Sequence, residues 1–433
     1  MKYFGTDGMR GAFGRFPADE FCFNILAQAL ERFHGRLAQV IIGRDPRLSG
    51  EAIKNFLIAG FSAGVEIVDA GVVISPLLSR AVSATESDFG LMITASHNPA
   101  ADNGVKIFDR AGAKLSRGAE LQIELLMDGI AASIENRGHK ITTYRVAGDY
   151  AADGKIFKNF SKVVIDCAHG AAVEFARKNY RFPAIDWIGD APDGGNINGR
   201  CGSEYPELLA REVCERRADL GIAHDGDGDR LLLCDGSGNV LPGEIILGII
   251  AIYLQNINTL ARQKIVTTLA SNGGLALALR ERGIGVCYAD VGDRNVAEKM
   301  GDLGCNFGGE RSGHVIFSDR APTSDGIQSA LLFLEAVDYL RISPAEIAGF
   351  MPLFPEKSCD IIVKEKIPLE QLPGLSDSVA AWERRLGGEG KIFIRYSGTE
   401  NKLRLLVEAK SSPLAEKIMK DLKNNIESCN KII

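Results

Sequence analysis

The chain has 433 residues, 45% of them apolar and 24% charged, which fits an ordered protein of several domains and excludes a disordered or fibrous one. Its 50 lysines and arginines are outnumbered by 56 aspartates and glutamates, so the net charge is −6 and we expect no nucleic-acid partner. The longest apolar stretch, 245–254, is too short to cross a membrane, so it predicts a buried helix and no membrane partner.

The N-terminal segment 1–11 has no basic region followed by an apolar run, and the 9 cysteines include no C-x-x-C pair. Scattered cysteines without zinc-ligand spacing suit a reducing compartment better than a disulfide framework. We therefore expect a cytoplasmic protein with free thiols.

Short β-rich runs then alternate with amphipathic segments, the pattern of α/β layers. The first block predicts a strand within 37–47, a helix over 49–64, a strand over 65–71, a helix over 75–84 and a strand over 89–93. The second predicts strands over 162–168, 184–189 and 219–223 and helices over 171–180 and 206–218. The third runs from a strand over 264–270 to an apolar helix over 324–340.

The C-terminal part predicts strands over 359–364, 391–396 and 402–409, then a helix with Ser412 as N-cap and Pro413 at its first position. Leu414, Ile418, Leu422 and Ile426 recur every four residues and would form its buried face. We therefore expect three α/β domains and a smaller C-terminal α+β domain. The predicted boundaries are 1–145, 146–241, 242–354 and 355–433.

The least ordinary loop is DGDGDR, residues 225–230, directly after a predicted buried strand. Asp225, Asp227 and Asp229 alternate with glycines that let the backbone curl, so their carboxylates can converge. At about 5 Å and an effective dielectric of ~20, each carboxylate pair would cost roughly 3 kcal/mol, which a bound cation would offset. Oxygen ligands favour Mg²⁺ over zinc. The alternative is an acidic turn with side chains splayed into water.

Two further loops carry polar side chains. RYSGTEN, residues 395–401, can wrap an anion with Arg395, Ser397, Thr399 and the backbone at Gly398, with Arg404 nearby, or can be an ordinary hairpin turn. GERSGH, residues 309–314, can bind sugar hydroxyls through Glu310 and Ser312 and move a proton with His314, or can be a glycine-rich connection.

The segment TASHNP, residues 94–99, ends the predicted strand 89–93 with residues that cannot extend a sheet. Ser96 in this turn is a candidate nucleophile. Together, the four loops supply a hydroxyl, a magnesium-type site, an anion cradle and a hydroxyl-binding loop, the parts needed to move a phosphoryl group onto a sugar. The chain lacks a P-loop, a kinase catalytic loop and a G-x-S-x-G elbow, so we expect the phosphoryl donor to be carried on the protein itself.

In this order along the whole chain, TASHNP, DGDGDR, GERSGH and RYSGTEN resemble the phosphoserine, metal, sugar and phosphate loops of the α-D-phosphohexomutase superfamily. The segments FGTDGMRG, NINGRCGS, VGDRNVAEKM and TSDGI are most similar to its bacterial branch that interconverts glucosamine 6-phosphate and glucosamine 1-phosphate. The resemblance implies four domains around a central cleft, the first three with mixed sheets. It also implies a bisphosphorylated sugar intermediate and a role in making UDP-N-acetylglucosamine for cell-wall precursors.

By the same resemblance, Ser96 carries the phosphoryl group on an exposed, stiff turn and, with Asp225, Asp227 and Asp229, binds one Mg²⁺ per subunit. His97, Lys106 and Arg10 would steady the transferring group, and Arg230 would offset developing charge. The residues implied for the non-reacting phosphate are Arg395, Ser397, Gly398, Thr399 and Arg404, and those for the sugar ring are Glu310, Ser312 and His314. The partner implied is a small hexosamine phosphate, with the chain a monomer or a homodimer.

The chain departs from this branch at Arg311, His169, Asn295 and Asn401, where Gln, Asn, Tyr and Pro are usual. A guanidinium beside the sugar's 2-position would repel an ammonium group, so the glucosamine assignment requires Arg311 to point away. The alternatives are a sister mutase acting on glucose or mannose phosphates, a phosphatase in which water intercepts the phosphoserine, and a non-catalytic sugar-phosphate-binding regulator.

Overall fold

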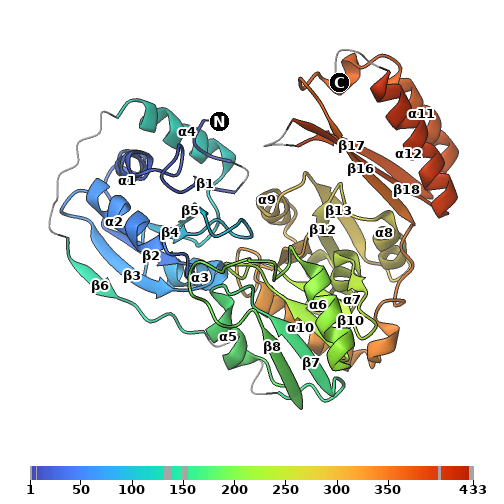
Figure 1. The fold of residues 1–433 in the computed structure, drawn as a ribbon, viewed down its shortest axis with the longest axis horizontal. Helices are drawn as coiled ribbons and strands as arrows, with labels where there is room; N and C mark the ends of the chain where they lie inside the picture. Colours follow the sequence, from blue (N-terminus) through green and yellow to red (C-terminus); the bar gives the residue numbers. More distant parts are fainter. Residues whose placement is uncertain are drawn as a thin grey trace.

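In the computed structural model, which describes residues 2–5, 7–130, 139–148, 150, 155–397 and 401–428, the chain forms four sheets. Figure 1 shows them as successive units along the chain, with the N-terminal unit on the left and the C-terminal unit at the upper right. Three short 3₁₀ helices (Ala261–Gln263, Pro344–Glu346 and Leu369–Gln371) complete the secondary structure of the described residues.

The first unit contains β1 (Met9–Ala12), α1 (Glu20–His34), β2 (Gln39–Arg44), α2 (Gly50–Gly60), β3 (Glu66–Val72), α3 (Ser75–Ala84), β4 (Phe89–Ile93), β5 (Asp102–Asp109), α4 (Arg117–Asp128) and β6 (Ile141–Thr143). Its strand order is β1-β5-β4-β2-β3-β6. Strand β2 runs parallel to β3 and β4, whereas β5 is antiparallel to β4 and β1. The sheet is therefore mixed.

The second unit contains β7 (Lys162–Asp166), α5 (Ala172–Asn179), β8 (Ala184–Ile188), α6 (Pro206–Arg216), β9 (Leu220–Ala223), β10 (Leu232–Asp235) and β11 (Val240–Leu241). The third contains α7 (Gly243–Asn256), β12 (Lys264–Thr268), α8 (Gly273–Arg280), β13 (Gly285–Ala289), α9 (Asp293–Leu303), β14 (Phe307–Gly309), β15 (Val315–Phe317) and α10 (Gly326–Tyr339). Both sheets combine parallel and antiparallel pairs, in the orders β11-β10-β9-β7-β8 and β13-β12-β14-β15.

The C-terminal unit contains β16 (Glu356–Ile362), α11 (Leu375–Leu386), β17 (Gly390–Tyr396), β18 (Lys402–Ala409) and α12 (Ser412–Glu427). Its sheet has the antiparallel order β16-β18-β17. Helix α12 buries Ile418, Leu422 and Ile426, as the spacing predicted, and leaves Leu414 half-buried. The predicted cap is wrong by one residue, because Ser411 has the extended backbone of an N-cap and Ser412 is already helical.

One continuous apolar core joins the first three units and includes Ile41, Ile165 and Ile265 from their three sheets. Helix α7 lies in it as the apolar stretch predicted, with most of its side chains buried, and it packs against α10. The C-terminal unit has a separate core, in which Leu403, Leu405 and Val407 of β18 pack with α12. The predicted fold class, with three mixed α/β sheets and a smaller α+β unit, is confirmed; the domain boundaries stay a prediction.

Within the described ranges of the chain, no helix combines the length and the apolar character that crossing a bilayer would require.

Candidate active site

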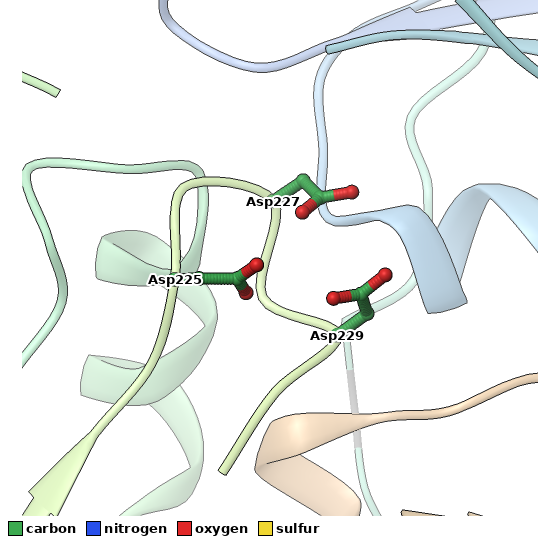
Figure 2. Close-up of side chains that lie close together, drawn as sticks. All are labelled: Asp225, Asp227 and Asp229. Carbon is green, nitrogen blue, oxygen red and sulfur yellow. The ribbon is translucent and has the colours of Figure 1, made fainter. Parts of the chain in front are cut away.

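Three carboxylates converge in the loop that follows β9. Asp225, Asp227 and Asp229 are almost fully buried, and each offers an oxygen within 4.8 Å of the others. Figure 2 shows the side chains reaching from one curled loop toward a common centre. The prediction of convergence is confirmed, and the solvated acidic turn is excluded.

The loop holds this shape because three different units bind its backbone. The N–H of Ser75 at the start of α3 donates to the carbonyl of Asp227 at 2.9 Å. The N–H groups of Ala171 and Gly326 donate to the carbonyls of Gly226 and Gly228 at 2.8 and 3.0 Å. A side chain at residue 226 has no room, since its Cβ would lie 2.7 Å from the carbonyl oxygen of Ser96.

The charges of the carboxylates are only partly balanced by protein groups. Lys106 Nζ lies 2.8 Å from Asp227 and 2.7 Å from Asp229, and 3.0 Å from Asp7. Burial, reinforced by Asp229 and Asp227, raises the pKa of Asp225 to about 7. The buried Oδ1 of Asp227 has no hydrogen-bond partner within the described part of the chain. This all-oxygen donor set with an unpartnered oxygen fits a hard cation such as Mg²⁺.

Ser96 adjoins these carboxylates. Its Oγ donates to Oδ2 of Asp225 at 2.7 Å and lies 3.3 Å from Nδ1 of His97. Its φ of 52° is in the left-handed region, which a strand or helix would not allow. The expectation of an exposed hydroxyl is wrong, since Ser96 is only 2% exposed and lies in the wall of a cavity.

The strained turn at Ser96 is fixed through its carbonyl oxygen. This oxygen accepts hydrogen bonds from Nη2 of Arg47 at 3.0 Å and from Nδ2 of Asn198 at 2.8 Å. The N–H of Ser96 donates to Oγ1 of Thr94 at 2.8 Å. Arg47, which the sequence analysis left unassigned, is buried beneath this turn and holds its shape.

The cavity has a volume of about 630 Å³ and draws residues from all four units. Arg10, Ser96 and His97 come from the first, and Arg230 from the second. The candidate sugar residues and the two candidate phosphate-loop arginines also line it, namely Glu310, Ser312, His314, Arg395 and Arg404. Lys106 reaches the carboxylates instead, and Ser397 is buried and is not among the residues that line the cavity. Gly398 and Thr399 lie outside the described residues.

The cavity has distinct electrostatic regions. Burial and Arg230 oppose the charge on His314, but Asp229, at 3.4 Å, and Glu310, at 3.3 Å, outweigh them and raise the pKa of His314 to about 10. Burial and the cations Arg230 and Arg10 lower the pKa of His97 to about 3. The carboxylates therefore favour the protonated form of His314, whereas burial and the nearby cations favour the neutral form of His97.

The two arginines of the phosphate loop are direct neighbours. Arg395 on β17 lies opposite Arg404 on β18. Burial and the nearby Arg404 lower the pKa of Arg395. Two guanidinium groups side by side at a cavity wall form a natural site for a phosphate dianion.

Arg311 points away from the cavity, as the glucosamine assignment requires. Its guanidinium pairs with both carboxylate oxygens of Glu356, at 2.5 and 3.0 Å. Arg311 is not among the residues that line the cavity, so its positive charge does not face the cavity.

Sequence reasoning missed several charged residues around the cavity. Lys114 bridges Asp7 at 2.8 Å and Asp293 at 2.7 Å, and thereby links the first and third units. Arg294 pairs with Glu120, and Glu204, which was also missed, pairs with the predicted Arg230. Asp7 and Asp293 lie in the segments GTDGMRG and VGDRNVAEKM, which resemble family segments and therefore gave a sequence signal for both residues. No local sequence pattern shows which residue each of them contacts.

The fold and this site define a phosphohexomutase. Family models of phosphoglucomutase/phosphomannomutase match residues 1–133 (α/β/α domain I), 242–354 (α/β/α domain III) and 360–424 (C-terminal domain). The chain therefore belongs to this α-D-phosphohexomutase family, whose members are isomerases that transfer a phosphoryl group within their substrate.

Its curated relatives define the branch more narrowly. The phosphoglucosamine mutase of Pelotomaculum thermopropionicum is 40% identical, with 98% of both chains covered. That of Nautilia profundicola is 38% identical, with 99% of both covered.

Solved structures share the fold at lower identity. A phosphoglucomutase/phosphomannomutase family protein from Burkholderia thailandensis has a TM-score of 0.80 at 22% identity, covering 99% of this chain and 97% of its own. The N-acetylphosphoglucosamine mutase of Aspergillus fumigatus, in complex with GlcNAc-6P and magnesium, has a TM-score of 0.66 at 17% identity, covering 98% and 95%.

Proposed function

We propose that this chain is a phosphoglucosamine mutase, which interconverts glucosamine 6-phosphate and glucosamine 1-phosphate through phosphorylated Ser96 and a bisphosphorylated sugar. The observation that carries the proposal is the hydroxyl of Ser96, 2.7 Å from one of three converging carboxylates, in the wall of a cavity that also contains Arg395 and Arg404. Full-length similarity to phosphoglucosamine mutases supports the choice of sugar.

In the transfer step, the bond between Ser96 Oγ and phosphorus breaks and a bond to the free sugar hydroxyl forms. The hydroxyl proton passes in net to Ser96, and the second half of the cycle reverses these changes with the sugar turned around. The Arg395 and Arg404 pair holds the phosphate that is not reacting, so one cradle serves both orientations. Protonated His314 and Arg230 face the same cavity and stabilise negative charge that develops there.

Asp225, Asp227 and Asp229, with an oxygen on Ser96, would hold one Mg²⁺. When bound, Mg²⁺ supplies positive charge beside the transferring phosphoryl group. Lys106 already neutralises part of the carboxylate charge through its ion pairs with Asp227 and Asp229. We also propose a cytoplasmic location, in keeping with a soluble sugar-phosphate substrate.

The test is a side-by-side assay of the hexose phosphates with Mg²⁺, followed by ³¹P NMR. Glucosamine 6-phosphate should be converted at a higher kcat/KM than the glucose and mannose phosphates, and peptide mass analysis should find phosphate on Ser96. Equal use of all three sugars would reassign the chain to a sister mutase. Stoichiometric release of inorganic phosphate would instead indicate a phosphatase.

A further inference from the structure

Arg311 stands in the middle of the candidate sugar loop, but its side chain leaves that loop for the C-terminal unit. Besides the two contacts to Glu356, its Nη1 lies 3.3 Å from the carbonyl oxygen of Ala270. Glu356 is the first residue of β16. The ion pair therefore connects the loop that carries Glu310, Ser312 and His314 to the sheet that carries Arg395 and Arg404.

Glu356 belongs to a row of charges across the C-terminal sheet. It lies directly opposite Glu408 on β18, which in turn lies opposite Lys391 on β17. Two like charges directly opposite each other destabilise a sheet. Lys391 lies 3.3 Å from Glu408, and Arg311 supplies the positive charge for Glu356. We call Glu356, Glu408 and Lys391 the charge row.

The charge row also binds the backbone of the third unit. Oε2 of Glu408 accepts a hydrogen bond from the N–H of Gly273 at 2.8 Å, and Lys391 donates to the carbonyl of Ser271. The C-terminal unit has its own apolar core, apart from the core that joins the other three. Polar contacts of this kind therefore help to fix the orientation of the C-terminal unit.

The same face of the sheet carries the phosphate-binding arginines. Side chains alternate between faces along a strand, so Arg404 points to the same side as Glu408, and Arg395 to the same side as Lys391. Four residues of strand separate the two rows, which is about 13 Å. If the C-terminal sheet tilted by about 10° about the charge row, the two arginines would move by about 2 Å relative to the sugar loop. A displacement of this size would break a contact in which both arginines bind one phosphate.

We propose that Arg311 is a positioning residue, which through Glu356 keeps the phosphate-binding arginines aligned with the sugar loop. The inference rests on the proposed function for its kinetic consequence, but the alignment itself is measurable without substrate. Arginines that are already aligned before binding lose less conformational entropy when the sugar phosphate binds. Loss of the Arg311–Glu356 ion pair should weaken the binding of the substrate and of the transition state equally. Such a loss raises KM and leaves kcat nearly unchanged.

The experiment compares Arg311→Gln, Arg311→Lys, Glu356→Gln and the double variant Arg311→Gln/Glu356→Gln with the wild type. Arg311→Gln and Glu356→Gln should each raise the KM for glucosamine 6-phosphate about tenfold and leave kcat within about threefold. The double variant should resemble either single one, because both remove the same link. Arg311→Lys should recover part of the loss, since it keeps the charge but not the paired geometry.

Hydrogen exchange of the substrate-free protein provides the second measurement. Arg311→Gln should speed exchange about threefold or more in segments 310–314 and 356–362 together. The matched control is Lys155→Gln, which removes a 2.7 Å ion pair to Asp338 between the second and third units, on exposed side chains away from the cavity. It should change neither KM nor exchange in those two segments.

The outcomes separate the two proposals. If the wild type isomerises no hexose phosphate but Arg311→Gln still loosens both segments, the function is wrong and the alignment role stands. If the wild type is active and Arg311→Gln leaves both KM and exchange unchanged, the alignment role is wrong. Additive effects of the two single substitutions would also overturn it. Should Arg311→Gln fail to fold, Glu356→Gln carries the same test.

Discussion

The hydroxyl of Ser96 donates a 2.7 Å hydrogen bond to Asp225 although 129 positions separate the two residues. Ser96 follows β4 of the first unit, and Asp225 follows β9 of the second. The contact requires the two loops to meet, and the lack of a side chain at Gly226 provides the space. The candidate chemistry therefore depends on how two units pack, not on either loop alone.

Replacing Ser96 with alanine should abolish isomerisation, by at least about 10³-fold in kcat, because the substitution removes the hydroxyl that is proposed to carry the phosphoryl group. The substitution removes one hydrogen bond to Asp225 and one proposed oxygen ligand, so folding should persist and Mg²⁺ should still bind through the three carboxylates. Calorimetric titration with Mg²⁺ and a coupled assay measure both effects. The control is Ser83→Ala on the exposed part of α3. Turnover retained by Ser96→Ala would remove this residue from the mechanism.

Asp227→Asn should raise the Mg²⁺ concentration needed for half-maximal activity at least about tenfold, since it replaces a charged ligand by a neutral one. The buried Oδ1 of Asp227 has no hydrogen-bond partner within the described part of the chain and is free to bind a cation. A metal titration of activity measures the effect. Asp302→Asn on the exposed side of α9 changes the net charge equally and should leave the metal dependence unaltered. Identical titration curves for Asp227→Asn and the wild type would argue against the site.

Gly226→Ala tests the close approach of the two loops. A Cβ at this position would lie 2.7 Å from the carbonyl of Ser96 and 2.9 Å from Nδ2 of Asn198. We expect a loss of roughly 1 to 3 kcal/mol in the free energy of unfolding and a fall in kcat of about 100-fold or more. Gly301→Ala is the matched control, because its Cβ meets nothing within 4 Å in α9 and should stabilise the protein slightly. A Gly226→Ala protein as active and stable as the wild type would contradict the packing described.

The raised pKa of Asp325 leads us to expect that the free energy of unfolding depends on pH. Burial outweighs the hydrogen bond from the N–H of Gln328 and raises the pKa of Asp325 to about 6, above its ordinary value of 3.8. The folded state therefore binds the proton more tightly than the unfolded state, so this residue stabilises the fold as pH falls from about 6 toward 4 and destabilises it above 6. Asp325→Asn keeps an oxygen to cap α10 and removes the charge.

The Asn variant should accordingly be more stable than the wild type by about 1 to 3 kcal/mol at pH 8, with the difference shrinking toward pH 4. Urea unfolding at pH 8, 6 and 4.5 measures it. A stability difference that stays constant over this range would show that the carboxyl group titrates normally in the folded protein.

Sequence periodicity located the elements that surround the site because their signals are local. The strand over 89–93 and the helix over 75–84 coincide with β4 and α3, and the apolar run 245–254 lies inside α7. Helix α1 was not assigned, although Asp19 at its start and the apolar side chains of Cys22, Ile25 and Leu26 provided the pattern. Helices α4 and α11 were also missed; both carry exposed charged faces that resemble loops in sequence.

The candidate site was predictable where a motif is contiguous and unpredictable where a contact is distant. The DGDGDR spacing was enough to expect converging carboxylates. Lys114 and Asp293 are 179 positions apart, and the local sequence around either residue does not predict their contact. The burial of Ser96 was also misjudged, since a turn in sequence gives no sign of the neighbouring unit that covers it.

By itself, the sequence determined the α/β architecture, the position of each polar loop at a strand end and the chemical groups that those loops offer, because hydrophobic period and turn composition act over a few residues. Only the tertiary structure decided which charges meet. It turned Arg311 toward Glu356, set Lys106 among three carboxylates and brought Arg395 into the cavity with Ser96. Electrostatic pairing depends on distances of a few ångströms between units, and the packing of the units alone sets those distances.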